Sequence, residues 1–225
     1  MKRFPAWLGI YAALLLVDII GSIADMPATH LYCKPLFLPM LFWGLWQNRK
    51  PIASTPWKWV MAGLFLSWVG DILLVFEQKD ALFFMGGLVS FLLAHICYII
   101  YYFSAGASLK MGVKKYPFYL LLIVVYTSGL MALLWPKLGG LLIPVAAYSV
   151  VLTFMLISSI ASVGAVTKKA SALLVSGAIF FVLSDSSLAI NKFYHSFPLA
   201  GVVIMLTYGL AQGLITMGTI KNKKE

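Results

Sequence analysis

The chain has 225 residues, of which 62% are hydrophobic and only 11% are charged, and its mean hydropathy is +0.95. Soluble domains carry about 25% charged residues, so this composition excludes a soluble globular protein and indicates an integral membrane protein. The formal net charge of +10 comes from 17 Lys and Arg against 7 Asp and Glu. In a soluble protein that balance would point to nucleic acid, but here its meaning depends on the topology.

Apolar runs bounded by charge, Pro or Gly predict the elements in chain order. A helix needs about 20 residues to cross a bilayer. The predicted spans cover residues 6–25, 33–47, 57–76, 81–104, 116–135, 139–161, 170–190 and 198–220. The second span is short and rich in proline. Eight spans leave only short loops, so we expect residues 1–225 to form a single transmembrane domain, an all-α bundle of eight helices.

The basic residues divide unequally between the two sides of these spans. One side receives 13 of them: Lys2, Arg3, Arg49, Lys50, Lys58, Lys110, Lys114, Lys115, Lys168, Lys169, Lys221, Lys223 and Lys224. The other side receives 4: Lys34, Lys79, Lys137 and Lys192. The positive-inside rule then places both termini in the cytoplasm, which requires an even number of spans. The excess charge therefore reports orientation and contact with membrane lipids, and nothing in it calls for nucleic acid.

Three acidic residues, Asp18, Asp71 and Asp185, fall inside apolar spans. At about 1.5 Å per residue, they lie roughly 18, 21 and 22 Å from the cytoplasmic ends of their helices. Their helices run in the same direction, so the carboxylates share nearly one depth in the outer half of the membrane. The other four acids, Asp25, Glu77, Asp80 and Glu225, lie at span ends, in loops or in the tail.

The third and seventh spans resemble each other. Gly63 precedes Asp71 by eight residues, as Gly177 precedes Asp185, and a small residue stands directly before each Asp. Each following span then carries a polar pair: His95 with Tyr98, and Tyr208 with Gln212. This pattern predicts two parallel halves of four helices. The match is short, so duplication and chance likeness both stay open.

An intramembrane carboxylate costs at least about 2.5 kcal/mol, so its default interpretation is functional. We expect Asp71 and Asp185 to be functional rather than helix-to-helix hydrogen-bonding groups. Asp18 is either a member of the site or the partner of Lys34 in a structural ion pair. His95, Tyr98, Tyr208 and Gln212 either line the floor of a pocket beneath the aspartates or hold helices together; both interpretations stay open.

The motifs that the chain lacks narrow its chemistry. It has no Gly-x-Ser-x-Gly, no His-Glu-x-x-His, no glycine-rich phosphate loop and no Cys or His cluster at metal spacing. We therefore expect no metal and no cofactor. Two carboxyls close together in an apolar site do not ionise together readily, so one can be a neutral acid while the other is an anion. That pair can carry out general acid catalysis with activation of water.

Five segments in order resemble the YhhN-like family of polytopic membrane proteins, the lysoplasmalogenases. They are Lys34-Pro35, Gly70–Leu74, Ala94–Tyr98, Ser184–Phe193 and Tyr208–Gln212. The resemblance implies an eight-helix enzyme that hydrolyses the vinyl ether of lysoplasmalogens to a fatty aldehyde and glycerophosphocholine or glycerophosphoethanolamine.

The resemblance also implies roles for residues in the matched segments. It makes Asp71 and Asp185 catalytic, and it places Asn191 and Lys192 among the substrate-binding candidates. Lys34, near the headgroup layer, either binds the substrate phosphate or is an interfacial lysine that extends toward water. The expected partners are a lysophospholipid substrate and membrane lipids.

Other readings of a two-aspartate membrane protein stay open. A proton-coupled transporter also holds carboxylates at mid-depth, and a non-catalytic lipid-binding protein would need no dyad. An intramembrane aspartyl protease fits less well, because Trp68 occupies the first glycine position of its Gly-x-Gly-Asp signature. The membrane is either a bacterial inner membrane or that of the endoplasmic reticulum. No motif encodes the oligomeric state.

Overall fold

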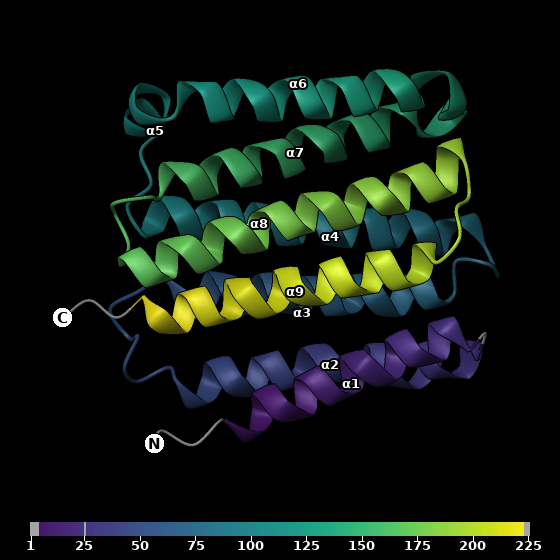
Figure 1. The fold of residues 1–225 in the computed structure, drawn as a ribbon, viewed down its shortest axis with the longest axis horizontal. Helices are drawn as coiled ribbons and strands as arrows, with labels where there is room; N and C mark the ends of the chain where they lie inside the picture. The colour runs from purple at the N-terminus through teal and green to yellow at the C-terminus, as the bar shows by residue number, and fades with distance from the viewer. Residues whose placement is uncertain (1–4, 25, 223–225) are drawn as a thin grey trace.

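The structure is a computed structural model that describes residues 5–24 and 26–222. Over these residues the fold is all-α, as predicted, and its long helices alternate in direction (Figure 1). The long helices are α1 (Ala6–Ile23), α2 (Pro27–Gln47), α3 (Trp57–Val75), α4 (Ala81–Ser104), α6 (Pro117–Leu134), α7 (Leu142–Ala161), α8 (Lys168–Ala189) and α9 (Ala200–Lys221). A short helix, α5 (Leu109–Lys115), two 3-10 turns (Trp135–Lys137 and Gly139–Leu141) and a π turn (Ile190–Tyr194) complete the described elements.

Seven of these helices are long and apolar enough to cross a membrane. The exception is α2, which has the length, at 21 residues, but contains Lys34 and the internal prolines Pro35 and Pro39. The helix begins at Pro27, ahead of the predicted span over residues 33–47. The sequence of its first turns is polar and has the hydropathy of a loop. A proline at the first position is nevertheless compatible with a helix, because the N–H there needs no partner within the helix.

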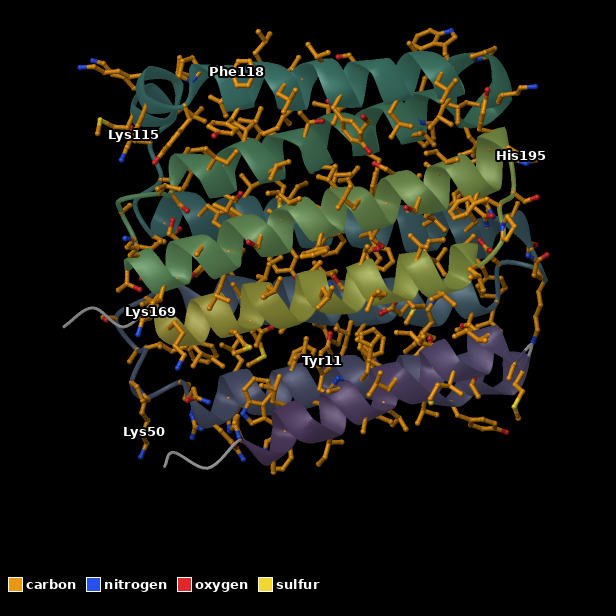
Figure 2. The ribbon with its side chains drawn as sticks, viewed as in Figure 1. Tyr11, Lys50, Lys115, Phe118, Lys169 and His195 are labelled. Atoms are coloured by element: carbon orange, nitrogen blue, oxygen red, sulfur yellow. The ribbon has the colours of Figure 1, made fainter. Side chains whose placement is uncertain are left out.

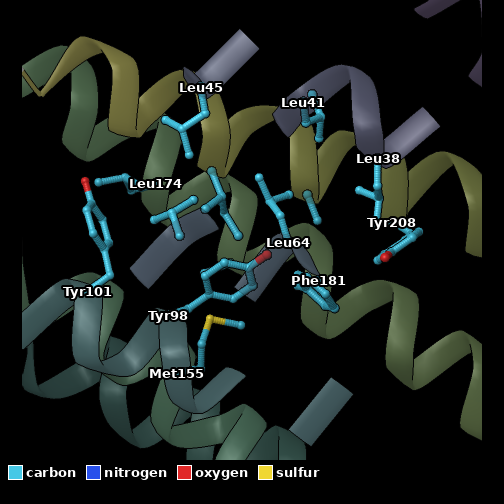
Figure 3. Close-up of a cluster of buried hydrophobic side chains, with 14 of the residues drawn as sticks. Leu38, Leu41, Leu45, Leu64, Tyr98, Tyr101, Met155, Leu174, Phe181 and Tyr208 are labelled. Atoms are coloured by element: carbon cyan, nitrogen blue, oxygen red, sulfur yellow. The ribbon is translucent and has the colours of Figure 1, made fainter. Parts of the chain in front are cut away.

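The helices stack in layers across the bundle. In Figure 1, α1 and α2 form one edge, α3 and α9 follow, then α4 and α8, then α7, and α6 with α5 forms the opposite edge. The tightest pairs are α8 with α9, α3 with α4, and α1 with α2. The central core lies between these pairs and is filled by large side chains such as Tyr98, Met155, Phe181 and Tyr208 (Figure 3).

The start of α1 and the end of α9 lie at the same end of the bundle (Figure 1). Lys50, Lys115 and Lys169 gather at that end, and His195 lies at the opposite one (Figure 2). We call the end that carries His195 the outer end. This arrangement agrees with the predicted division of basic residues between two faces.

Two glycines allow close packing in the pairs that carry Asp71 and Asp185. A Cβ at Gly63 of α3 would lie 2.5 Å from the ring of Tyr98 on α4. A Cβ at Gly177 of α8 would lie 3.0 Å from the carbonyl oxygen of Ala211 on α9. In both pairs, the glycine that precedes the Asp by eight residues lets the next helix approach closely.

Candidate functional site

A pocket of about 120 Å³ lies in the outer half of the bundle, and both Asp71 and Asp185 line it. Most of its other lining groups are apolar side chains, chiefly from α4, α6, α7, α8 and α9. Asp71 stands about one turn before the end of α3, and Asp185 about one turn before the end of α8, which the π turn extends toward the outer end. The carboxylates of two sequence-distant helices thus face one apolar space.

Asp185 is held by two side chains from other helices. The hydroxyl of Tyr148 on α7 donates a hydrogen bond to its Oδ2 at 2.6 Å. Nε2 of His95 on α4 lies 3.3 Å from the same oxygen and 2.9 Å from the Tyr148 hydroxyl. His95 is fully buried, and its ring meets that of Phe181 edge-on at 4.5 Å between centroids. His95 therefore has a packing role and also a polar contact with the carboxylate.

Sequence reasoning missed Tyr148. Its helix is mostly apolar, and Tyr148 with Ser149 forms a polar pair in the first half of the helix that lines the pocket. A polar pair within an apolar span is the signal that could have identified it.

Asp71 is held by a different chain of hydrogen bonds. The hydroxyl of Tyr208 on α9 donates to its Oδ2 at 2.9 Å. Gln212, one turn further along α9, donates to the Tyr208 hydroxyl at 3.3 Å and accepts from the Tyr98 hydroxyl at 2.7 Å. Asp71 is only 2% exposed. Of the four residues predicted either to line the pocket floor or to hold helices together, Tyr208 lines the pocket, whereas Tyr98, Gln212 and His95 do not.

At the site, polar contacts connect the α3–α4 pair with the α8–α9 pair. Asp71 on α3 is bonded by α9, the partner of α8, and Asp185 on α8 is bonded by α4, the partner of α3. Each carboxylate thus has a polar contact from the helix pair to which it does not belong, and Asp185 also accepts a hydrogen bond from α7.

Lys34 also lines the pocket, on the α2 side. Pro39 has no N–H, so the carbonyl of Pro35 lacks its partner within the helix, and the indole Nε1 of Trp68 on α3 donates to that carbonyl at 2.8 Å. This bond ties α2 to α3 directly beside Lys34.

Three further predicted residues, Asp18, Asn191 and Lys192, differ in where they lie relative to the pocket. Asp18 is 1% exposed in α1 and is not among the residues that line the pocket. Asn191 Oδ1 accepts a hydrogen bond from the backbone N–H of Phe197 at 3.4 Å, so it braces the connection to α9. Lys192 lines the pocket at the outer end, where its Nζ lies 2.8 Å from Oε2 of Glu77 and 4.2 Å from the ring centroid of Phe84.

The arrangement suits acid–base chemistry on an apolar molecule. The pocket offers two carboxylates in fixed orientations, each held by a tyrosine hydroxyl, and otherwise mostly hydrocarbon. The positively charged side chains in the lining are Lys34 and Lys192. An apolar lining with a few polar groups is the chemistry that would contact the reacting part of an amphiphile.

Comparison with known proteins gives consistent matches over most of the chain. Lysoplasmalogenase TMEM86A of Homo sapiens is 29% identical over 202 residues, covering 88% of this chain and 80% of that protein. The lysoplasmalogenase of Mycobacterium tuberculosis is 32% identical over 168 residues, covering 72% and 60%. Lysoplasmalogenase TMEM86B of Mus musculus is 28% identical over 195 residues, covering 84% and 74%. No solved structure matches the chain.

The family model described as the YhhN family matches residues 29–219, a range that contains Lys34, both pocket aspartates and all of their hydrogen-bond partners. The chain therefore belongs to the YhhN family.

Proposed function

We propose that this chain is a lysoplasmalogenase, which hydrolyses the vinyl ether of a lysoplasmalogen to a fatty aldehyde and glycerophosphocholine or glycerophosphoethanolamine. The observation that carries the proposal is that Asp71 and Asp185 line one apolar pocket in a chain whose relatives bear that name. Two carboxylates that line one apolar pocket can supply both the acid and the base that this hydrolysis needs.

The proposed topology has eight crossings and both termini in the cytoplasm. With 21 residues at 1.5 Å each, α2 is about 31 Å long, enough for a hydrocarbon layer of about 30 Å. The common end of α1 and α9 and the lysines gathered there support an even number of crossings (Figure 2). The matching roles of Gly63 and Gly177 in their helix pairs support a parallel repeat.

The first chemical step is protonation of carbon. Asp71, as the neutral acid, gives its proton to the vinyl carbon farther from the ether oxygen, and the other vinyl carbon becomes part of an oxocarbenium ion. Asp185, as the anion, stabilises that cation, much as one carboxylate does in glycoside hydrolysis. Asp185 takes the anionic role because Oδ2 accepts from Tyr148 and lies near His95, and hydrogen bonds to a carboxylate stabilise its charged form. Tyr208 leaves the second oxygen of Asp71 free to carry the proton.

The remaining steps return both carboxyl groups to their starting protonation states. Water adds to the oxocarbenium carbon while Asp185 takes a proton from it, which gives a hemiacetal. Asp185 then returns that proton to the glycerol oxygen as the carbon–oxygen bond breaks, and Asp71 takes the proton of the hemiacetal hydroxyl. The products are the aldehyde and the glycerophospho-alcohol, and the cycle consumes water without net release of protons.

Aldehyde release from a 1-alkenyl-lysophosphatidylcholine by the purified protein in detergent tests this function. We expect release from the vinyl ether and none from lysophosphatidylcholine, whose acyl ester replaces the vinyl ether. In D₂O the aldehyde is expected to carry deuterium on the carbon beside its carbonyl, because that carbon receives the exchangeable proton of Asp71. Mass spectrometry of the aldehyde measures this. Absence of aldehyde, with pH-dependent solute flux in proteoliposomes, would instead support a transporter.

Tyr148→Phe is expected to lower kcat by about ten- to a hundredfold, because a hydrogen bond to a charged group contributes about 1.5–3 kcal/mol. KM is expected to stay near the wild-type value, since the lost hydroxyl orients Asp185 and leaves the apolar lining intact. Steady-state aldehyde release measures both constants. Tyr126→Phe is the matched control, because Tyr126 is an exposed tyrosine of α6. An unchanged kcat, or a raised KM alone, would show that Tyr148 does not position the carboxylate.

A further inference from the structure

An ion pair that includes one pocket-lining residue, Lys192, lies at the outer end of the pocket. Nζ of Lys192, in the π turn that follows α8, lies 2.8 Å from Oε2 of Glu77, just beyond α3, and the two side chains are 28% and 24% exposed. Partly exposed ion pairs contribute little to stability, typically below about 1 kcal/mol. Separating the pair to admit a ligand therefore costs little free energy.

An aromatic face adjoins the ion pair. The ammonium of Lys192 lies 4.2 Å from the ring centroid of Phe84, and the ring of Phe193 meets Phe84 edge-on at 5.9 Å. Phe84, Lys192 and Phe193 all line the pocket that holds the aspartates. A ring that already attracts one ammonium group can attract another, including a quaternary one.

The distance along the helix from Asp185 to Lys192 is comparable to the length of a phospholipid headgroup. Lys192 follows Asp185 by seven residues of helical chain, about 10 Å at 1.5 Å per residue. A glycerophospho-headgroup spans a comparable length between its vinyl ether and its charged end. A substrate with its vinyl ether beside Asp185 therefore brings its phosphate and its amine to the outer end of the pocket.

Given the lysoplasmalogenase activity proposed above, we propose that Lys192, Glu77 and Phe84 form a binding site for a zwitterionic phospholipid headgroup. Lys192 binds the phosphate, with Lys34 as a second positive charge in the same pocket. Glu77 and the face of Phe84 bind the ammonium of choline or ethanolamine. The headgroup replaces one ion pair of the protein by two ion pairs with the ligand, so a zwitterion is favoured over a lipid with a single charge.

The test compares kcat/KM for three vinyl ethers: 1-alkenyl-lysophosphatidylcholine, 1-alkenylglycerol phosphate and 1-alkenylglycerol. Glu77→Gln is expected to lower the value for the choline lipid about tenfold and to leave it undiminished for the two lipids without an amine. Lys192→Met is expected to lower it about tenfold for both phosphate-bearing lipids and to spare 1-alkenylglycerol. Lys79→Met, an exposed lysine in the same outer loop, is the control and leaves all three unchanged.

Exchanging the two charges distinguishes a headgroup-binding role of the ion pair from a purely structural role. The double variant Glu77→Lys plus Lys192→Glu restores an ion pair with reversed polarity. If the pair only fastens α8 to the loop after α3, the swap recovers the activity lost in the single variants. If the pair is a headgroup site, the loss with the choline lipid persists. Recovery in the swap, or an equal loss with all three lipids in the single variants, overturns the proposal.

A binding measurement keeps this inference separate from the proposed hydrolysis. Should the wild-type protein release no aldehyde from any vinyl ether, the proposed function fails, yet the headgroup site remains testable. Calorimetric titration with lysophosphatidylcholine and with monoacylglycerol is expected to show about tenfold weaker binding of the zwitterion alone in Glu77→Gln. Equal affinity of wild type and variant for lysophosphatidylcholine overturns the site.

Discussion

Asp185→Asn is expected to lower kcat for vinyl ether hydrolysis by about 10²- to 10⁴-fold, the range that a general acid or base contributes, with KM within a few-fold of the wild-type value. The amide keeps the shape of the carboxyl but carries no negative charge, so it neither stabilises the oxocarbenium ion nor accepts the proton of water. Tyr148 and His95 would then orient a group without the required basicity. Continuous measurement of aldehyde release gives kcat and KM.

Ser187→Ala is the matched control on the same helix. Ser187 follows Asp185 by two residues, and its hydroxyl donates to the backbone carbonyl of Leu183 at 2.8 Å rather than to the pocket. We expect wild-type turnover from this variant and equal melting temperatures for both variants in detergent. Turnover near the wild-type rate in Asp185→Asn would remove Asp185 from the mechanism.

Asp71→Asn is expected to reduce kcat over the same range of about 10²- to 10⁴-fold, because an amide cannot deliver a proton to carbon. Asp71 is almost fully enclosed, and Tyr208 is its direct hydrogen-bond partner. Neither water nor a surface side chain therefore replaces the lost acid at the vinyl carbon. The measurement is single-turnover aldehyde release, which reports the protonation and collapse steps without product dissociation.

Thr207→Val provides the comparison for Asp71. Thr207 adjoins Tyr208 on α9, but it is partly exposed and does not line the pocket, and its hydroxyl donates to the backbone carbonyl of Val203 at 2.6 Å. This variant should keep the wild-type single-turnover rate. Retention of that rate in Asp71→Asn as well would contradict its assignment as the proton donor, whatever the result for Asp185.

The order and type of the helices were predictable from the sequence, because hydropathy is a property of consecutive residues. Each apolar run forms a helix when no water is available to bond its backbone, and seven of the resulting helices meet the length and composition of a membrane span. The constant rise of a helix predicted similar positions for Asp71 and Asp185 along their helices, and both stand about one turn before the helix end. The turns of α2 that precede residue 33 were not predicted, because hydropathy does not distinguish a polar first turn of a helix from a loop.

The sequence by itself thus determined the all-α class, the family, the separation of basic residues between two ends and the presence of carboxylates within apolar helices. Only the tertiary structure decided which side chain meets which carboxylate. Tyr148 reaches Asp185 across 37 residues of chain, and Tyr208 reaches Asp71 across 137. The ion pair of Lys192 with Glu77 joins residues 115 apart. Such contacts depend on which helix faces pack together, and a pattern of hydropathy along the chain carries no information on that choice.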